Sequence, residues 1–272
     1  MQDIINEIEK KQEVSVSGEV TAVRGLMLEC QGIERFLSVG ARVKIYPSDS
    51  SQNIKNLMAE VVGFRGDVAL LMPFSSLDGV GLGARVELLS TDSAVYPSDA
   101  WLGRVVNALG EPVDGGPPLP KGSYACPIKA APPNAHSRMR VEGKMNLGVR
   151  AMNTFLTCCR GQRMGIFAGS GVGKSIMMSM LARGSEADVN VIGLIGERGR
   201  EVQEFIQDDL GEEGLKRSVI VVATSDEYAL MRRQAAYMTL AISEYFRDQG
   251  KHVLCLMDSV TRFAMAQREI GL

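Results

Sequence analysis

A glycine-rich segment near the middle of the sequence has the residue types that hold the phosphates of a nucleotide. Such a loop needs glycines, because they let consecutive backbone amides point at phosphate oxygens. It also needs a mobile cation for the phosphates and a hydroxyl group for a magnesium ion. The residues predicted to bind nucleotide are Ala168, Gly169, Ser170, Gly171, Val172, Gly173, Lys174, Ser175 and Ile176. Lys174 supplies the charge, and Ser175 offers its hydroxyl to Mg²⁺. Ala168 stands where the usual G-x-x-x-x-G-K-S/T pattern has glycine, and the remaining glycines carry the tight turn.

Two acidic residues follow apolar runs that are typical of buried strands. Asp258 closes the run 253–257, and Glu197 comes shortly after the run 189–195. Ligand sites lie at the carboxyl ends of parallel strands, so we expect Asp258 to serve the magnesium ion and Glu197 to orient and polarise the attacking water. Glu201 follows Glu197 by one helical turn and is expected to be a structural or supporting partner.

Two arginines lie beside these acids in the sequence. Arg198 and Arg262 are candidates to hold the γ phosphate or its developing charge, and either could instead be an ordinary ion-pair residue. The predicted catalytic residues are therefore Lys174, Glu197, Arg198 and Arg262, and the predicted metal ligands are Ser175 and Asp258.

The elements that must position these residues are predicted from the apolar periodicity of the second half of the sequence. Strands are expected at 163–168, 189–195, 219–224 and 253–257, and helices at 176–183 and 229–249. Strands that alternate with helices predict an α/β domain with a mainly parallel sheet.

The first part of the sequence has a different period. Between residues 14 and 90 apolar residues alternate with polar ones and are interrupted by turn residues, which predicts a small β-barrel or sandwich. Proline-rich connectors follow at 115–120 and 131–134. The predicted division is an N-terminal arm (1–13), a β-barrel domain (14–92), a linker and domain-entry segment (93–146) and the nucleotide domain (147–272).

Composition excludes several classes of protein. The 272 residues carry a net charge of -2, which argues against binding of nucleic acid or of an anionic membrane through the overall charge of the protein. The five cysteines show neither metal-ligand spacing nor a disulfide framework. No apolar run reaches the roughly 18 residues of a membrane span, and the start of the sequence does not resemble a signal peptide. We therefore expect a cytoplasmic location.

Three stretches together resemble the flagellum-specific and type III secretion export ATPases, namely 168–175, 196–202 and 257–269. The segment 102–115 is similar to one shared with catalytic subunits of rotary ATP synthases. This resemblance implies an N-terminal β-barrel, a RecA-like P-loop domain and hexameric rings with sites between subunits. It places Lys174, Glu197 and Asp258 at the family's phosphate-loop lysine, catalytic glutamate and magnesium-associated aspartate, with ATP and Mg²⁺ as cofactors.

The resemblance also implies a biological role. It is Mg-dependent ATP hydrolysis that powers flagellar or type III protein export, by releasing substrates from chaperones and delivering them to the export gate. The implied partners are a flagellar stator-like regulator, stalk proteins, chaperone–substrate complexes and the gate itself, at the cytoplasmic side of the inner membrane. Family members continue beyond the point where this sequence stops, so the resemblance predicts a C-terminally truncated nucleotide domain, whose own turnover it leaves open.

Three other functions remain open on the sequence. One is the catalytic subunit of a rotary proton-translocating ATPase, and another is a noncatalytic nucleotide-binding or assembly module. The third is a hexameric RNA translocase, which would need a basic, aromatic surface in the barrel. Residues 14–90 offer only the aromatic residues Phe36, Tyr46, Phe64 and Phe74, so no nucleic-acid partner is expected.

Overall fold

The computed structural model describes residues 15–47, 56–91, 93–169 and 171–271. Contacts within the chain divide it into two compact units, Met1–Ser93 and Ala94–Leu272. The arm predicted for residues 1–13 and the predicted phosphate-loop residue Ser170 lie outside the described residues. The finer domain boundaries expected from the sequence stay predictions.

The first unit contains a closed barrel whose strands follow the order β1-β2-β5-β4-β3-β6. The strands are β1 (Ser17–Arg24), β2 (Met27–Gln31), β3 (Arg42–Tyr46), β4 (Leu57–Arg65), β5 (Val68–Pro73) and β6 (Arg85–Ser90). Every pairing is antiparallel, and β6 closes the barrel by pairing with β1. The predicted β-barrel is confirmed.

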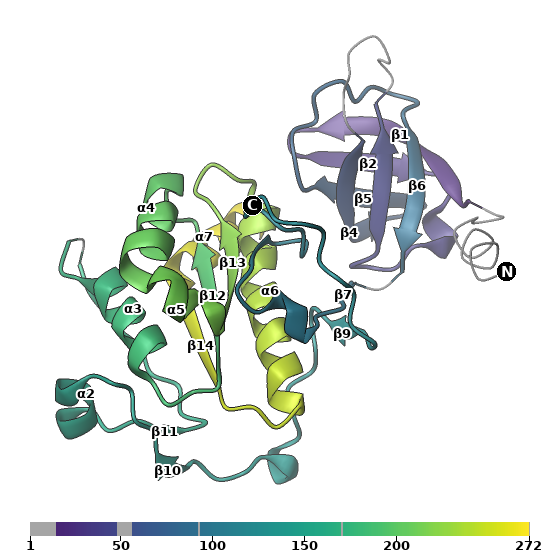
Figure 1. Cartoon of the computed structure of the whole chain (residues 1–272). Helices are drawn as coiled ribbons and strands as arrows, with labels where there is room; N and C mark the ends of the chain where they lie inside the picture. The colour runs from purple at the N-terminus through teal and green to yellow at the C-terminus, as the bar shows by residue number, and fades with distance from the viewer. Residues whose placement is uncertain (1–14, 48–55, 92, 170, 272) are drawn as a thin grey trace, which may run out of the picture. The chain divides into compact units, whose positions relative to one another are not determined.

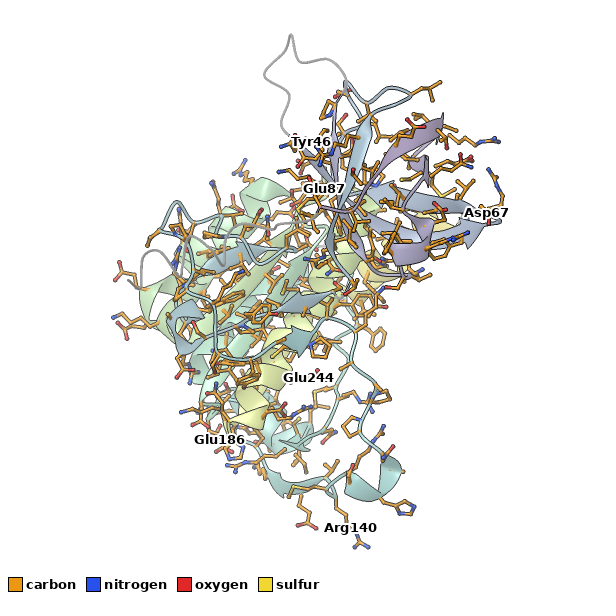
Figure 2. The ribbon with its side chains drawn as sticks, turned by 90° about the vertical axis from the view of Figure 1, so that its right-hand side faces the viewer. Tyr46, Asp67, Glu87, Arg140, Glu186 and Glu244 are labelled. Atoms are coloured by element: carbon orange, nitrogen blue, oxygen red, sulfur yellow. The ribbon has the colours of Figure 1, made fainter. Side chains whose placement is uncertain are left out.

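The barrel is filled by the apolar side chains that alternate along its strands. Val43 and Ile45 of β3 are fully buried and pack with Leu28, Val61 and Leu71 from other strands. Outward-facing polar residues also join neighbouring strands. The Tyr46 hydroxyl of β3 donates a hydrogen bond to the Glu87 carboxylate of β6, as Figure 2 allows the reader to follow.

The second unit is built on a four-stranded parallel sheet with the order β14-β12-β13-β8. The strands are β8 (Val105–Asn107), β12 (Val189–Ile195), β13 (Ser218–Ala223) and β14 (Val253–Asp258). β12 has a neighbour on each edge and is buried along its whole length, as expected for an inner strand of a sheet that is covered on both faces. The predicted α/β class with a mainly parallel sheet is confirmed.

Helices cover both faces of this sheet. They are α3 (Lys174–Gly184), α4 (Gly199–Glu204), α5 (Gly211–Lys216), α6 (Ala229–Asp248) and α7 (Val260–Gly271), with a π-helical segment (Phe205–Leu210) between α4 and α5. Figure 1 shows α3, α4 and α5 on one side of the strands and α6 on the other. The helix predicted at 229–249 corresponds to α6, and its apolar residues Leu230, Met238 and Ile242 are buried.

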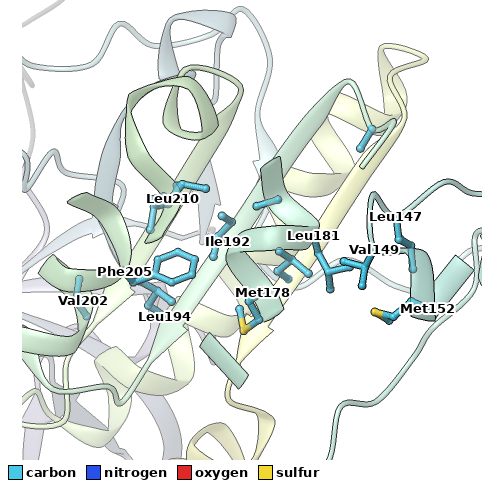
Figure 3. Packing of buried hydrophobic residues seen from close by; sticks show 14 of the residues in the cluster. Leu147, Val149, Met152, Met178, Leu181, Ile192, Leu194, Val202, Phe205 and Leu210 are labelled. Carbon is cyan, nitrogen blue, oxygen red and sulfur yellow. The ribbon is translucent and has the colours of Figure 1, made fainter. Parts of the chain in front are cut away.

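The core between α3 and the sheet fixes the helix that follows the glycine loop. Met178 and Leu181 of α3 belong to one buried cluster with Ile192, Leu194 and Phe205, which Figure 3 shows at close range. Fully burying one such side chain contributes about 1.5–3 kcal/mol. The start of α3 is therefore held against the sheet by packing further along the helix.

Arg217 holds the other end of α3. Its guanidinium donates hydrogen bonds to the carbonyl oxygens of Ala182 and Ser185, where α3 ends, and of Ala187, just before β12. The carbonyls at the end of α3 lie where a helix runs out of its own donors, and a cation near a helix C-terminus is favourable. Arg217 thereby fixes α3 relative to the strand that leads to Glu197.

The prediction of a strand at 163–168 is wrong. These residues form no regular element and are exposed, with Phe167 98% accessible and Met164 and Ile166 each 40% accessible. A strand needs a neighbouring backbone to accept and donate its hydrogen bonds. No described strand pairs with 163–168, and the outer edge of β14 has no pairing partner within the described part of the chain either.

The remaining elements are short. They are β7 (Ala94–Val95), β9 (Cys126–Pro127), β10 (Glu142–Lys144), β11 (Cys159–Arg160), α2 (Arg150–Phe155) and three 3₁₀ turns (Glu34–Phe36, Asp99–Trp101 and Ala135–Ser137). The proline-rich segments 115–120 and 131–134 are loops, as predicted. Among the described residues, none of the helices combines the length and the apolar character that crossing a membrane requires.

Candidate functional site

The glycine loop leads directly into α3. Gly171 and Gly173 have φ angles of 76° and 91°, a left-handed conformation that disfavours residues with a side chain. A Cβ atom added at Gly169, Gly171 or Gly173 would meet no atom within 4 Å, so the space beside these three glycines is open. A ligand can therefore approach the loop backbone closely.

The first turn of α3 presents free backbone donors beside this loop. The first hydrogen bond of the helix runs from the Met177 N–H to the Gly173 carbonyl at 2.9 Å. The N–H groups of Lys174, Ser175 and Ile176 consequently have no partner within the helix. Ser175 is exposed in the same turn. Backbone donors at a helix start, open glycines and a hydroxyl together suit the binding of phosphate groups.

Lys174 and Asp258 are brought together from distant parts of the sequence. The Nζ atom of Lys174 forms an ion pair and a hydrogen bond with Oδ1 of Asp258 at the end of β14. The Asp258 side chain is 4% accessible and that of Lys174 is 31% accessible. Asp258, which is predicted to bind the metal, and Lys174, which is predicted to bind the phosphates, are therefore in direct contact.

Glu197 lies at the end of the neighbouring strand, just beyond β12. Its carbonyl oxygen accepts a hydrogen bond from the Ser225 N–H at 2.9 Å, which ties it to the segment that follows β13. Burial raises the pKa of Glu197 to about 7, and the hydrogen bond with Glu201 and the charge of Asp258 act in the same direction. The positive charges of Arg262 and Lys174 oppose this rise.

The side chain of Arg262 packs against the backbone of Gly196, close to Glu197 and Glu201. A Cβ atom at Gly196 would lie 2.8 Å from Cδ of Arg262, and Gly196 has a φ of 73°. The charge of Arg262 acts to lower the pKa of both Glu197 and Glu201. The structure therefore places Arg262 of α7 in the same cluster as Lys174, Glu197 and Asp258.

Arg198 lies at the edge of this cluster. Its side chain is 78% accessible and forms an ion pair with Glu201, with 3.3 Å between Nη1 and Oε1. Val172 and Ile176 of the predicted phosphate loop are also exposed, and Ala168 lies in the irregular segment before it.

The glycine at 196 is a residue that the sequence did not single out. Its place directly between a buried strand and an acid was the available signal. Its contact with Arg262 depends on the fold, because the two residues come from distant parts of the sequence.

The donor set fits a magnesium ion that shares its ligands with a nucleotide. No group of three or more histidine, cysteine or acidic side chains that could hold a metal occurs among the described residues. Mg²⁺ in phosphate-transfer sites commonly takes only one or two protein oxygens and completes its shell with phosphate oxygens and water. The hydroxyl of Ser175 and the carboxylate of Asp258 supply oxygens of that kind at the loop.

Comparison with known proteins identifies both units. The model of the ATP synthase alpha/beta family, nucleotide-binding domain, matches residues 148–272, and that of the same family's beta-barrel domain matches residues 14–89. The chain belongs to this family. Its relatives within the family include the "Flagellum-specific ATP synthase" of Caulobacter vibrioides, which is 59% identical over the whole chain, and the "Type 3 secretion system ATPase" of Xanthomonas euvesicatoria, 50% identical over 94% of it.

A solved structure gives the same result. This family member superposes on the assembled ATPase EscN in complex with its central stalk EscO, from the type III secretion system of enteropathogenic E. coli, with a TM-score of 0.83 and 39% identity. The match covers 94% of this chain and 60% of EscN. The chain spans 60% of the length of the Caulobacter relative and 56% of the Xanthomonas one. The resemblance to flagellum-specific and type III secretion ATPases is confirmed.

The contact between Gly196 and Arg262 gives a stability prediction. Gly196→Ala places a side chain at positive φ and against Arg262, so we expect the free energy of unfolding to fall by about 1–3 kcal/mol. Urea unfolding followed by the fluorescence of Trp101, the sole tryptophan, measures this loss in the second unit. Gly199→Ala is the matched control, because Gly199 begins α4 with no atom near its missing Cβ, and it should leave stability unchanged or slightly raised. Equal unfolding curves for wild type and Gly196→Ala would contradict the packing described.

Proposed function

We propose that this protein hydrolyses ATP in the presence of Mg²⁺, and that the site lies where β12 and β14 end beside the start of α3. The observation that carries the proposal is the meeting of Lys174, Glu197, Asp258 and Arg262 next to the open glycine loop. These residues come from two strand ends and two helices, and together they supply charge for phosphates, oxygens for a cation and a carboxylate for water.

The binding roles follow from position. The loop and the first turn of α3, residues 168–176, hold the phosphates through backbone N–H groups, and Lys174 neutralises the β and γ phosphates. Ser175 and Asp258 would hold the magnesium ion. When bound there, the ion would supply positive charge that stabilises the phosphate oxygens. Lys174 must then turn from Asp258 towards the phosphates, which its partly exposed side chain allows.

Glu197 is the proposed general base. A base works best when its pKa lies near the working pH, because it must be ionised and still attract a proton, and the pKa of Glu197 is about 7. Arg262 supports the site by placing a positive charge beside Glu197, where charge on the transferring group develops. Arg198, at the exposed edge of the cluster, is proposed to stabilise the same negative charge that develops on the transferring phosphate group.

The biological role proposed is the driving of flagellar or type III protein export. The complete protein would form hexameric rings and bind stalk proteins and a stator-like regulator. It would release substrates from chaperones and deliver them to the export gate, at the cytoplasmic side of the inner membrane. The support is the naming of the relatives as flagellum-specific and type 3 secretion ATPases, together with the assembly of EscN with its central stalk. These relatives favour export over a rotary proton pump or a noncatalytic assembly module.

Nucleotide binding is tested by removing the loop's cation. Lys174→Ala removes the charge that meets the phosphates, so we expect the chain's affinity for Mg·ATP to fall by at least about tenfold, which is about 1.4 kcal/mol. Isothermal titration calorimetry of wild type and variant measures the difference. Lys216→Ala serves as control, because Lys216 is an exposed lysine of α5 that pairs with Glu213. Equal affinity of wild type and Lys174→Ala would remove the loop from nucleotide binding.

Hydrolysis is tested by neutralising the base. Glu197→Gln keeps the size of the side chain but cannot accept a proton, so turnover should fall by about 10²–10⁴-fold while the affinity for Mg·ATP is retained. Release of phosphate from saturating ATP measures turnover, in this chain and in the complete protein. Turnover of Glu197→Gln at the wild-type rate would show that another group activates the water.

A further inference from the structure

The turn between β13 and α6, residues 224–228, holds the backbone of the proposed base. The Ser225 N–H in this turn donates a hydrogen bond to the Glu197 carbonyl at 2.9 Å. Just before Glu197, the Gly196 N–H donates one to the Ala223 carbonyl at the end of β13, at 2.6 Å. The residues between the end of β12 and the start of α4 are irregular. The position of the Glu197 backbone therefore depends on how firmly the turn itself is held.

Two hydrogen bonds close this turn, and a third ties it to α6. The Glu227 N–H donates to the Thr224 carbonyl, and Oε1 of Glu227 accepts from the Thr224 N–H, both at 3.1 Å. The Glu227 carbonyl oxygen accepts a hydrogen bond from Nε of Arg232, in the first turn of α6, at 3.0 Å. The turn that bonds to Glu197 is thus attached to α6 through the Arg232 side chain.

The other end of the same guanidinium reaches α7. Nη2 of Arg232 donates a hydrogen bond to Oε2 of Glu269 at 2.7 Å, and the Arg232 side chain is only 14% accessible. α7 packs against α6 and carries Arg262 two helical turns before Glu269. A guanidinium is planar and directs its donors rigidly, so its bonds from Nε and Nη2 fix the turn and α7 relative to each other.

We propose that Arg232 is a positioning residue: by joining the turn 224–228 to α7, it holds the backbone of Glu197 and the helix of Arg262 in register. It acts on Glu197 through the Ser225 N–H and on Arg262 through α7. The effect on turnover rests on the proposed function, whereas the clamp itself does not. The glycine loop and α3 are held separately, by the core under α3 and by Arg217, so the clamp serves the chemical step rather than nucleotide binding.

Hydrogen exchange of single amides, followed by NMR in the whole 272-residue chain, tests the clamp without ATP. Arg232→Ala removes both side-chain bonds, so the Ser225 N–H should exchange at least about tenfold faster than in the wild type. The Ile220 N–H, which donates to the Arg104 carbonyl at 3.1 Å within the sheet, should exchange at the wild-type rate. Unchanged exchange at Ser225, or an equal rise at Ser225 and Ile220, would overturn the proposal.

Two further variants sharpen this test. Arg247→Ala is the matched control, because Arg247 lies in the last turn of α6 and pairs with Asp248 at 2.7 Å, and it should leave exchange at Ser225 unchanged. Glu269→Ala removes an exposed side chain and cuts the bond to α7 alone, so it keeps the test decisive if Arg232→Ala does not fold. It should also speed exchange at Ser225, by a smaller factor. Exchange at the wild-type rate in Glu269→Ala would refute the link to α7.

Steady-state kinetics test the consequence for turnover, in this chain and in the complete protein. Because a displacement of about 1 Å in a catalytic group can cost about 10²-fold in rate, we expect kcat of Arg232→Ala to fall by about 10- to 100-fold. The KM for Mg·ATP should stay within about threefold of the wild-type value. Wild-type kcat in Arg232→Ala, or a loss confined to KM, would overturn the positioning role. If Ser225 exchange rises as expected but the wild type hydrolyses no ATP, the clamp stands and the proposed function fails.

Discussion

The parallel register of β12 with its two neighbours is the constraint on which the site depends. Leu194 pairs with Asp258 of β14, and Ile195 pairs with Ala223 of β13, so all three strands end at the same edge of the sheet. Glu197 and Asp258 lie far apart in the sequence, and this register alone brings them to one place. A shift of β14 by one residue would turn the Asp258 side chain to the opposite face and away from Lys174.

The second constraint is electrostatic. The sheet edge gathers three carboxyl groups, those of Glu197, Glu201 and Asp258, around the cations Lys174 and Arg262. Burial raises the pKa of Glu197, and the hydrogen bond with Glu201 and the negative charge of Asp258 add to that rise. The resulting pKa of about 7 lies in the range in which a carboxylate can serve as a base near neutral pH.

Much of this arrangement could be predicted from the sequence, because apolar runs and glycine positions indicate the strands and the loop locally. The apolar runs that become β12 and β14 are followed by acids, and Gly171 and Gly173 before Lys174 adopt the left-handed backbone that glycine permits. The run 163–168 shows the limit of this reasoning. It is as apolar as a strand, but strand formation depends on a pairing partner, which composition does not reveal. The contact between Gly196 and Arg262 likewise exists only once α7 packs beside β12.

The central claim is that the glycine loop, Lys174 and Asp258 form one site for Mg·ATP. A crystal structure of the chain with magnesium and a non-hydrolysable ATP analogue tests it most directly. The account predicts that the β and γ phosphates lie against the backbone of the loop and the first turn of α3. It also predicts that Lys174 Nζ has moved from Asp258 to a phosphate oxygen and that Asp258 faces the metal. A nucleotide bound elsewhere, with the ion pair between Lys174 and Asp258 intact, would contradict the account.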